Sequence, residues 1–295
     1  WSYATLGLSP SSSLLSSLGR RAERVCDEFK PQHIANTLWS YATLGLSPSS
    51  SLLSSLGGRA ERVCDEFNPQ NIANTLWSYA TLGLSPSSSL LSSLGRRAER
   101  VCDEFKPQEI ANTLWSYATL GLSPSSSLLS LLGRRAERVC GGFNSQNIAN
   151  TLWSYATLGL SPSSSLLSSL GGRAERVCDE FNPQNIANTL WSYATLGLSP
   201  SSSLLSSLGR RAERVCDEFK PQEIANTLWS YATLGLSPSS SLLSLLGRRA
   251  ERVCDEFKPQ AIANTLWSYA TLGLSPSSSL LSSLGRRAER VCDEF

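Results

Sequence analysis

One unit of 38 residues is repeated along the whole chain, and this repetition constrains the fold more than any other feature. Tryptophan recurs at that spacing and nowhere else: Trp1, Trp39, Trp77, Trp115, Trp153, Trp191, Trp229 and Trp267. A fixed period of this length is typical of proteins in which one supersecondary unit stacks on copies of itself. The repetition overrides the roughly two globular domains that the chain length would suggest. We expect one tandem array over residues 1–295, with seven full units and a partial one. Because the chain starts and stops inside the unit, we also expect it to be a fragment of a longer protein.

Each unit carries the sequence signals of two helices joined by a turn. Over residues 31–44 a helix is expected, because Pro31 suits the first helical position and Gly45 can adopt the left-handed conformation that ends it. Ser47 is the expected N-cap of the second helix, in which apolar residues recur at helical spacing over residues 52–67. Gly57 lies inside that helix and costs about 1 kcal/mol relative to alanine, so a bend or a break is expected there. The pattern predicts an all-α fold, a right-handed α-solenoid of about eight helix-turn-helix repeats.

The first helix is apolar over a broad side and polar along a narrow strip. At about 100° per residue, the apolar positions are Ile34, Ala35, Leu38, Trp39 and Ala42. We expect the tryptophan of each unit to lie in the core with its indole N–H at a boundary. The strip contains residue 33 with Asn36, Thr37, Ser40 and Thr43, and its copies would line up as polar rows on one open surface.

One column of the strip varies between units, while almost every other position is copied. It takes four residue types: His33, Asn71, Glu109, Asn147, Asn185, Glu223 and Ala261. Residues 39–152 also recur as residues 153–266 with five differences, so the chain contains duplicated blocks of three units and its copies are not independent. Two interpretations stay open for the variable column: drift at an exposed position in the first turn, and a recognition code.

The cysteines also recur every 38 residues. Equivalent atoms of stacked helical repeats lie roughly 10 Å apart, whereas the Cα atoms of a disulfide lie within about 7 Å. Neighbouring copies should therefore not form disulfides. We expect each cysteine to be a small core residue in a reducing compartment.

The first helix resembles a known family of helical repeats. The segment PQNIANTLWSYATLGL and the 38-residue period are similar to those of the octotricopeptide repeat proteins of green algae and related eukaryotes, and the resemblance covers the whole chain. It implies an α-solenoid that binds RNA in an organelle, the chloroplast or the mitochondrion, and acts in RNA processing, stability or translation. Related helical repeats read one base per repeat, which implies that RNA contacts the variable column and two columns below it. These two columns are the asparagines Asn36, Asn74, Asn112, Asn150, Asn188, Asn226 and Asn264, and the serines Ser40, Ser78, Ser116, Ser154, Ser192, Ser230 and Ser268.

Charge and composition separate the functional hypotheses. The net charge of +2 is too small for strong nonspecific binding of a polyanion. Arg20, Arg21 and Arg24 of each unit could still neutralise phosphates, and affinity for RNA would then fall steeply with salt. The first hypothesis is modest binding of single-stranded RNA. The alternative is a scaffold that binds protein partners on a concave surface without nucleic acid.

Other functional classes find little support in the sequence. A single histidine and serine runs without an activating base argue against an enzyme. We expect no cofactor, no metal and no small-molecule substrate. We also expect no membrane partner, because no apolar run approaches the roughly 18 residues of a membrane span.

Overall fold

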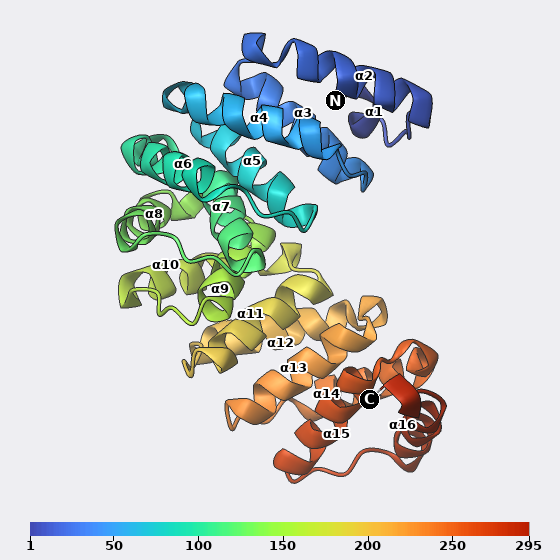
Figure 1. Ribbon diagram of the computed structural model, residues 1–295. Coiled ribbons are helices and arrows are strands. Elements are labelled where there is room, and N and C mark those ends of the chain that lie inside the picture. Colours follow the sequence, from blue (N-terminus) through green and yellow to red (C-terminus); the bar gives the residue numbers. More distant parts are fainter. Residues whose placement is uncertain (295) are drawn as a thin grey trace. The chain divides into compact units, whose positions relative to one another are not determined.

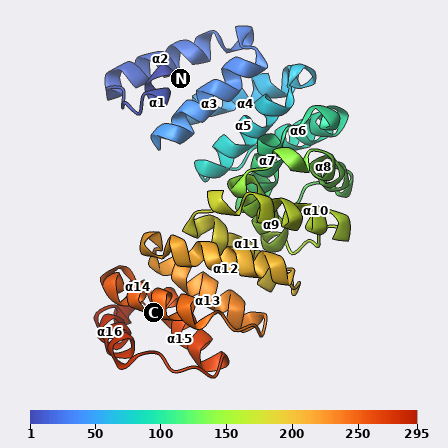
Figure 2. The same ribbon diagram turned by 180° about the vertical axis from the view of Figure 1, so that it is seen from behind.

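The computed structural model describes residues 1–294, and within them every regular element is a helix. The chain divides into two compact units, Trp1–Gly142 and Phe143–Phe295. Within each unit, the first helices of successive repeats pack on one another and the second helices form a separate layer (Figures 1 and 2). This stacking confirms the α-solenoid. The extent of the array over residues 1–295 and the duplicated blocks 39–152 and 153–266 stay predictions. The boundary between the two compact units, after Gly142, lies inside the first of these blocks.

Two helices per repeat alternate along the chain. The first helices are α1 (Ser2–Thr5), α3 (Pro31–Leu44), α5 (Pro69–Thr81), α7 (Pro107–Thr119), α9 (Ser145–Thr157), α11 (Pro183–Thr195), α13 (Pro221–Thr233) and α15 (Pro259–Thr271). The second helices are α2 (Ser12–Arg24), α4 (Ser50–Arg62), α6 (Ser88–Arg100), α8 (Ser126–Arg138), α10 (Ser164–Arg176), α12 (Ser202–Arg214), α14 (Ser240–Arg252) and α16 (Ser278–Arg290). A short 3₁₀ helix follows each second helix, as at Cys64–Glu66.

Local sequence explains most helix boundaries. The helix expected over residues 31–44 is confirmed as α3, and Gly45 follows it at φ 64°. The N-cap expected at Ser47 is wrong, because Ser49 caps α4 by accepting the Leu52 N–H at 3.2 Å. The Ser49 hydroxyl also contacts the preceding repeat, because its Oγ donates to the Glu23 carboxylate at 2.8 Å.

The glycine inside each second helix leaves room for a tyrosine of the next repeat. The break expected at Gly57 does not occur, because α4 is one α-helix from Ser50 to Arg62, and the bend stays a prediction. A Cβ at Gly57 would lie 3.4 Å from the Tyr79 hydroxyl oxygen. Close approach of the tyrosine thus accounts for a residue that helix propensity disfavours.

Gly285 offers a test of this explanation, because a Cβ there would meet nothing within 4 Å. We expect Gly285→Ala to stabilise α16 by about 1 kcal/mol, the cost of glycine relative to alanine inside a helix. Gly273, at φ 66°, is the matched control. Gly273→Ala should destabilise the repeat by about 1 kcal/mol, because an L-residue is strained in the left-handed conformation. Hydrogen–deuterium exchange of the α16 amides measures both effects, and shifts in the same direction would contradict the explanation.

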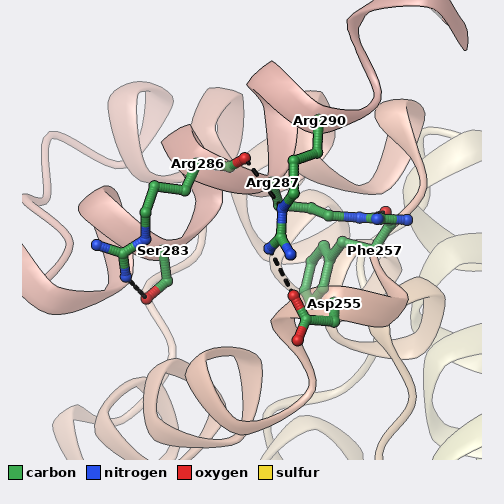
Figure 3. A network of polar contacts seen from close by, with 6 residues as sticks. All are labelled: Asp255, Phe257, Ser283, Arg286, Arg287 and Arg290. Carbon is green, nitrogen blue, oxygen red and sulfur yellow. Dashed lines mark hydrogen bonds and ion pairs between the residues drawn. The ribbon is translucent and has the colours of Figure 1, made fainter.

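Polar contacts join each second helix to the repeat before it. At the last junction, Arg290 Nη2 donates to Asp255 Oδ1 at 2.5 Å and Arg287 Nε donates to the Phe257 carbonyl oxygen at 2.9 Å (Figure 3). The arginine–aspartate pair recurs as Arg62–Asp27, Arg100–Asp65, Arg138–Asp103, Arg214–Asp179 and Arg252–Asp217. These side chains are more than half exposed, so each pair contributes at most about 1 kcal/mol. Burial of apolar side chains is therefore the main stabilising contribution at the junctions.

Buried tyrosines make the fold sensitive to alkaline pH. Burial, aided by a nearby glutamate, raises the pKa to about 12 for Tyr79, Tyr117, Tyr193 and Tyr231. The ordinary value is about 10, so the folded state holds these protons more tightly than the unfolded state. Their contribution to stability is complete below pH ~10 and is lost as pH rises toward ~12. Burial also raises the pKa of the thiol of Cys64, which acts in the same direction.

We therefore expect the free energy of unfolding to fall above pH ~10, by up to about 1.4 kcal/mol per pH unit for each tyrosine, and the urea midpoint to fall with it. Circular dichroism measures the midpoint, and absorbance of the tyrosinate reports ionisation. Ionisation of all tyrosines near pH ~10 with the helices intact would contradict this expectation.

The cysteines lie mainly in the core. Those buried are Cys26, Cys64, Cys102, Cys140, Cys178, Cys216 and Cys254, whereas Cys292 is exposed, and no disulfide occurs among residues 1–294. The core position is thus confirmed for all but Cys292. Burial of a thiol is compatible with any redox compartment, so the expected reducing compartment is not supported. Within the same residues, the structure contains no helix with both the length and the apolar character needed to cross a membrane.

Candidate nucleic-acid-binding surface

One face of each first helix remains accessible within the stack. In α13 it is formed by Gln222, Asn226, Trp229 and Thr233, which are exposed or partly exposed. Their spacing of four, three and four residues places them within about 60° of one another around the helix. The same four residue types occupy these positions in every complete first helix. We call these columns together the tryptophan–amide face.

In the second compact unit, Phe143–Phe295, this face forms a groove of about 400 Å³ across α9, α11, α13 and α15. Its lining consists only of tryptophans and side-chain amides: Trp153, Asn188, Trp191, Gln222, Asn226, Trp229, Gln260 and Asn264. The Gln222 Nε2 donates to the Asn226 Oδ1 at 2.8 Å, which orients both amides. The groove thus offers flat aromatic surfaces beside hydrogen-bond donors and acceptors.

The tryptophans were expected in the core, and this prediction is wrong. Trp153, Trp191 and Trp229 are only partly buried, and Trp267 is 47% exposed. The glutamine column was missed altogether. The helical spacing of Gln32, Asn36, Trp39 and Thr43 is the signal that could have identified this face.

The groove lining among the described residues is uncharged. Lys220 and Lys258 precede α13 and α15 as exposed N-cap residues. Their ammonium groups and the positive ends of the helix dipoles bring positive charge to the N-terminal ends of these helices.

The arginines expected to neutralise phosphates lie on the second helices, away from the groove lining. One arginine column forms the ion pairs with aspartate, and another donates to a phenylalanine carbonyl, as Arg211 Nε does to Phe181 at 2.8 Å. The third contacts serines of its own helix, as Arg210 Nη1 does with the Ser206 Oγ at 3.0 Å. Most of the arginine charge therefore supports the fold.

The variable column is mostly buried, so the expectation of an exposed position is wrong. Asn71 is 7% exposed, Asn147 and Asn185 are 6% exposed, and Ala261 is 1% exposed. Glu109 and Glu223 are partly buried, and only His33 is exposed. The side chains lie at the third helical position, and the Asn185 Nδ2 donates to the Ser145 Oγ of the preceding first helix at 3.1 Å.

Helix capping accounts for much of the variation in this column. After an asparagine N-cap the column holds asparagine, as where the Asn182 Oδ1 accepts the Asn185 N–H at 2.8 Å. After a lysine N-cap it holds a different residue, and the Glu223 Oε2 accepts the Lys220 N–H at 2.8 Å. Burial raises the pKa of the Glu223 carboxyl, and this backbone hydrogen bond partly offsets the effect. Glu109, Asn147 and Glu223 thus cap their helices, whereas the buried Asn185 side chain donates to the preceding first helix, and these side chains offer little to a ligand.

The serine column is also buried, contrary to expectation. Ser40 is 9% exposed, and the other members are fully buried: Ser78, Ser116, Ser154, Ser192, Ser230 and Ser268. Each hydroxyl donates to a carbonyl four residues earlier, as Ser230 Oγ does to Asn226 at 2.6 Å. A small side chain whose hydroxyl is hydrogen-bonded within its own helix lets neighbouring first helices pack closely. Of the three columns expected to contact RNA, only the asparagines, from Asn36 to Asn264, lie on the accessible face.

Among residues 1–294, no group of three histidine, cysteine, aspartate or glutamate side chains could hold a metal ion. The only histidine, His33, lies against Phe29 with ring centroids 5.6 Å apart, and its Nδ1 accepts the Lys30 N–H at 3.3 Å. Stacking and hydrogen bonding are the interactions that the accessible groups can make.

Comparison with known families decides the affiliation of the chain. The sequence pattern of the RNA-editing substrate-binding complex 6 protein family, RESC6, matches residues 1–163 and again residues 135–294. The chain belongs to the RESC6 family. No curated protein matches it. The RESC6 match supports a helical-repeat family associated with RNA and does not single out octotricopeptide repeats.

Proposed function

We propose that the chain binds single-stranded RNA through the tryptophan–amide face. The groove of the second unit carries this proposal, because three tryptophans and five side-chain amides line it together. Aromatic side chains stack on unpaired bases, and amides hydrogen-bond to base edges. Bases inside a duplex are stacked on one another and cannot use such a surface.

The family supports RNA as the ligand and a binding role instead of catalysis. The name RESC6 describes members of a complex that binds the substrate of RNA editing. We infer that this chain supplies RNA-binding surface to such a complex. The octotricopeptide resemblance supports an organellar site of action, in the chloroplast or mitochondrion, and a role in RNA processing, stability or translation.

Fluorescence anisotropy with labelled RNA of one sequence, single-stranded or annealed to its complement, tests the proposal. We expect the single strand to bind and the duplex to bind at least tenfold more weakly. The slope of log affinity against log salt should be no steeper than about −1.4, since each phosphate contact of a single strand contributes about −0.7 and only Lys220 and Lys258 adjoin the groove helices as lysine N-caps. Equal binding of duplex and single strand would overturn the proposal.

A protein-binding scaffold is the second candidate, and the uncharged lining of the groove favours it. Amides and partly exposed tryptophans also suit protein surfaces. Affinity purification before and after ribonuclease treatment separates the two functions. Partners that depend on RNA support the first candidate, and partners that persist with no bound RNA support the second.

A further inference from the structure

The accessible residues of the tryptophan–amide face do not vary between repeats. Each complete first helix presents the same glutamine, asparagine, tryptophan and threonine. The columns that vary lie on the second helix, in the 3₁₀ turn or at the N-terminal end of the first helix, and the most variable one is largely buried. Successive repeats therefore offer successive ligand units the same chemistry. A surface of this kind matches an RNA in which one base is repeated.

Hydrogen bonding within a repeat narrows the choice of base. Because Gln222 donates to the Asn226 Oδ1, the Gln222 Oε1 and the Asn226 Nδ2 remain available as an acceptor and a donor in one repeat. Adenine presents the complementary pair, its N6 amino donor beside the N7 acceptor, and asparagine or glutamine is the usual partner of that edge. Guanine is usually read by arginine or lysine and cytosine by a carboxylate. Neither type lines the groove among the described residues.

The tryptophans favour the same base. Trp153, Trp191 and Trp229 come from successive first helices and line one groove. Uracil could satisfy an amide pair as well, but a purine has the larger π-surface for stacking on an indole. The two interactions together distinguish adenine from the pyrimidines.

We propose that this face binds adenine-rich single-stranded RNA, with one adenine per repeat stacked on tryptophan and hydrogen-bonded by the asparagine–glutamine pair. This inference rests on the proposed function and names its substrate class.

The test measures the affinity of the whole chain for labelled oligoadenylate, oligouridylate, oligocytidylate and a mixed sequence of equal length. We expect oligoadenylate to bind about tenfold or more tighter than each pyrimidine homopolymer, the discrimination of a good bidentate contact. Equal affinities, or a preference for a pyrimidine, would overturn the inference and leave the proposed function standing. Absence of binding to all four RNAs would overturn both.

A variant separates hydrogen bonding from stacking. Replacing Asn188, Asn226 and Asn264 with alanine should reduce the preference for adenine over uracil about fivefold or more, because adenine loses its bidentate contact. Circular dichroism confirms that the variant is folded. An unchanged preference in a folded variant would overturn the role of the asparagines.

Discussion

Trp191→Ala should lower the affinity for single-stranded RNA about five- to 150-fold, because stacking on an aromatic side chain contributes about 1–3 kcal/mol per base. Trp191 lies in the groove with Trp153 and Trp229, so a strand that follows the groove would contact all three. The triple alanine variant should therefore abolish measurable binding. Anisotropy titration of one labelled RNA against each variant measures the effect.

Two substitutions control this prediction. Trp191→Phe retains an aromatic surface and should recover most of the affinity. Arg210 lies on a second helix, at the position that Gly58 and Gly172 occupy in two other repeats. Arg210→Gly should therefore leave RNA binding nearly unchanged. A larger loss from Arg210→Gly than from Trp191→Ala would move the binding surface to the second helices and contradict the assignment.

Phe219→Ala should produce the largest loss of stability, about 3–5 kcal/mol in the free energy of unfolding. Phe219 is fully buried where the 3₁₀ turn meets the next repeat, and its carbonyl oxygen accepts the Arg249 Nε–H at 2.9 Å. Solenoid repeats contact only their neighbours, so the loss should affect the flanking repeats first. Urea denaturation gives the total change, and hydrogen–deuterium exchange shows which helices lose protection.

Phe219→Leu is the matched control and should cost less than about 1.5 kcal/mol, because the core keeps most of its volume. Phe29→Ala provides a second comparison, since the equivalent side chain is only partly buried there. A similar cost at Phe29 and Phe219 would contradict the link between burial and stability.

Much of the fold could be predicted from the sequence because its determinants are local. Pro31 and Gly45 mark the bounds of a helix through backbone conformation alone, and the 38-residue period indicates stacking. Lys30 precedes this helix and makes no side-chain capping hydrogen bond, because its ammonium group has no acceptor. The N-cap was predicted at Ser47 instead of Ser49, because the Ser49 hydroxyl also contacts Glu23 of another repeat, which the local sequence does not indicate.

The candidate site was harder to predict because polarity did not identify the exposed face. Serine and threonine are polar, yet Ser230 and Thr227 are fully buried between closely packed helices. Tryptophan is apolar, yet Trp229 borders the groove. Which side of a nearly apolar helix stays open depends on how closely the neighbouring helices approach. Residue size governs that distance more than hydropathy does.

The junction contacts also bear on how such a chain can change over generations. In most second helices the same arginine meets the same aspartate of the preceding repeat, as in Arg252–Asp217 and Arg290–Asp255, although Gly141 replaces the aspartate before α10. Insertion or loss of a whole repeat would bring together two surfaces that already fit. Unequal recombination could therefore lengthen or shorten the array without new compensating substitutions, and under the proposed function the number of nucleotides bound would change by one repeat's share at a time.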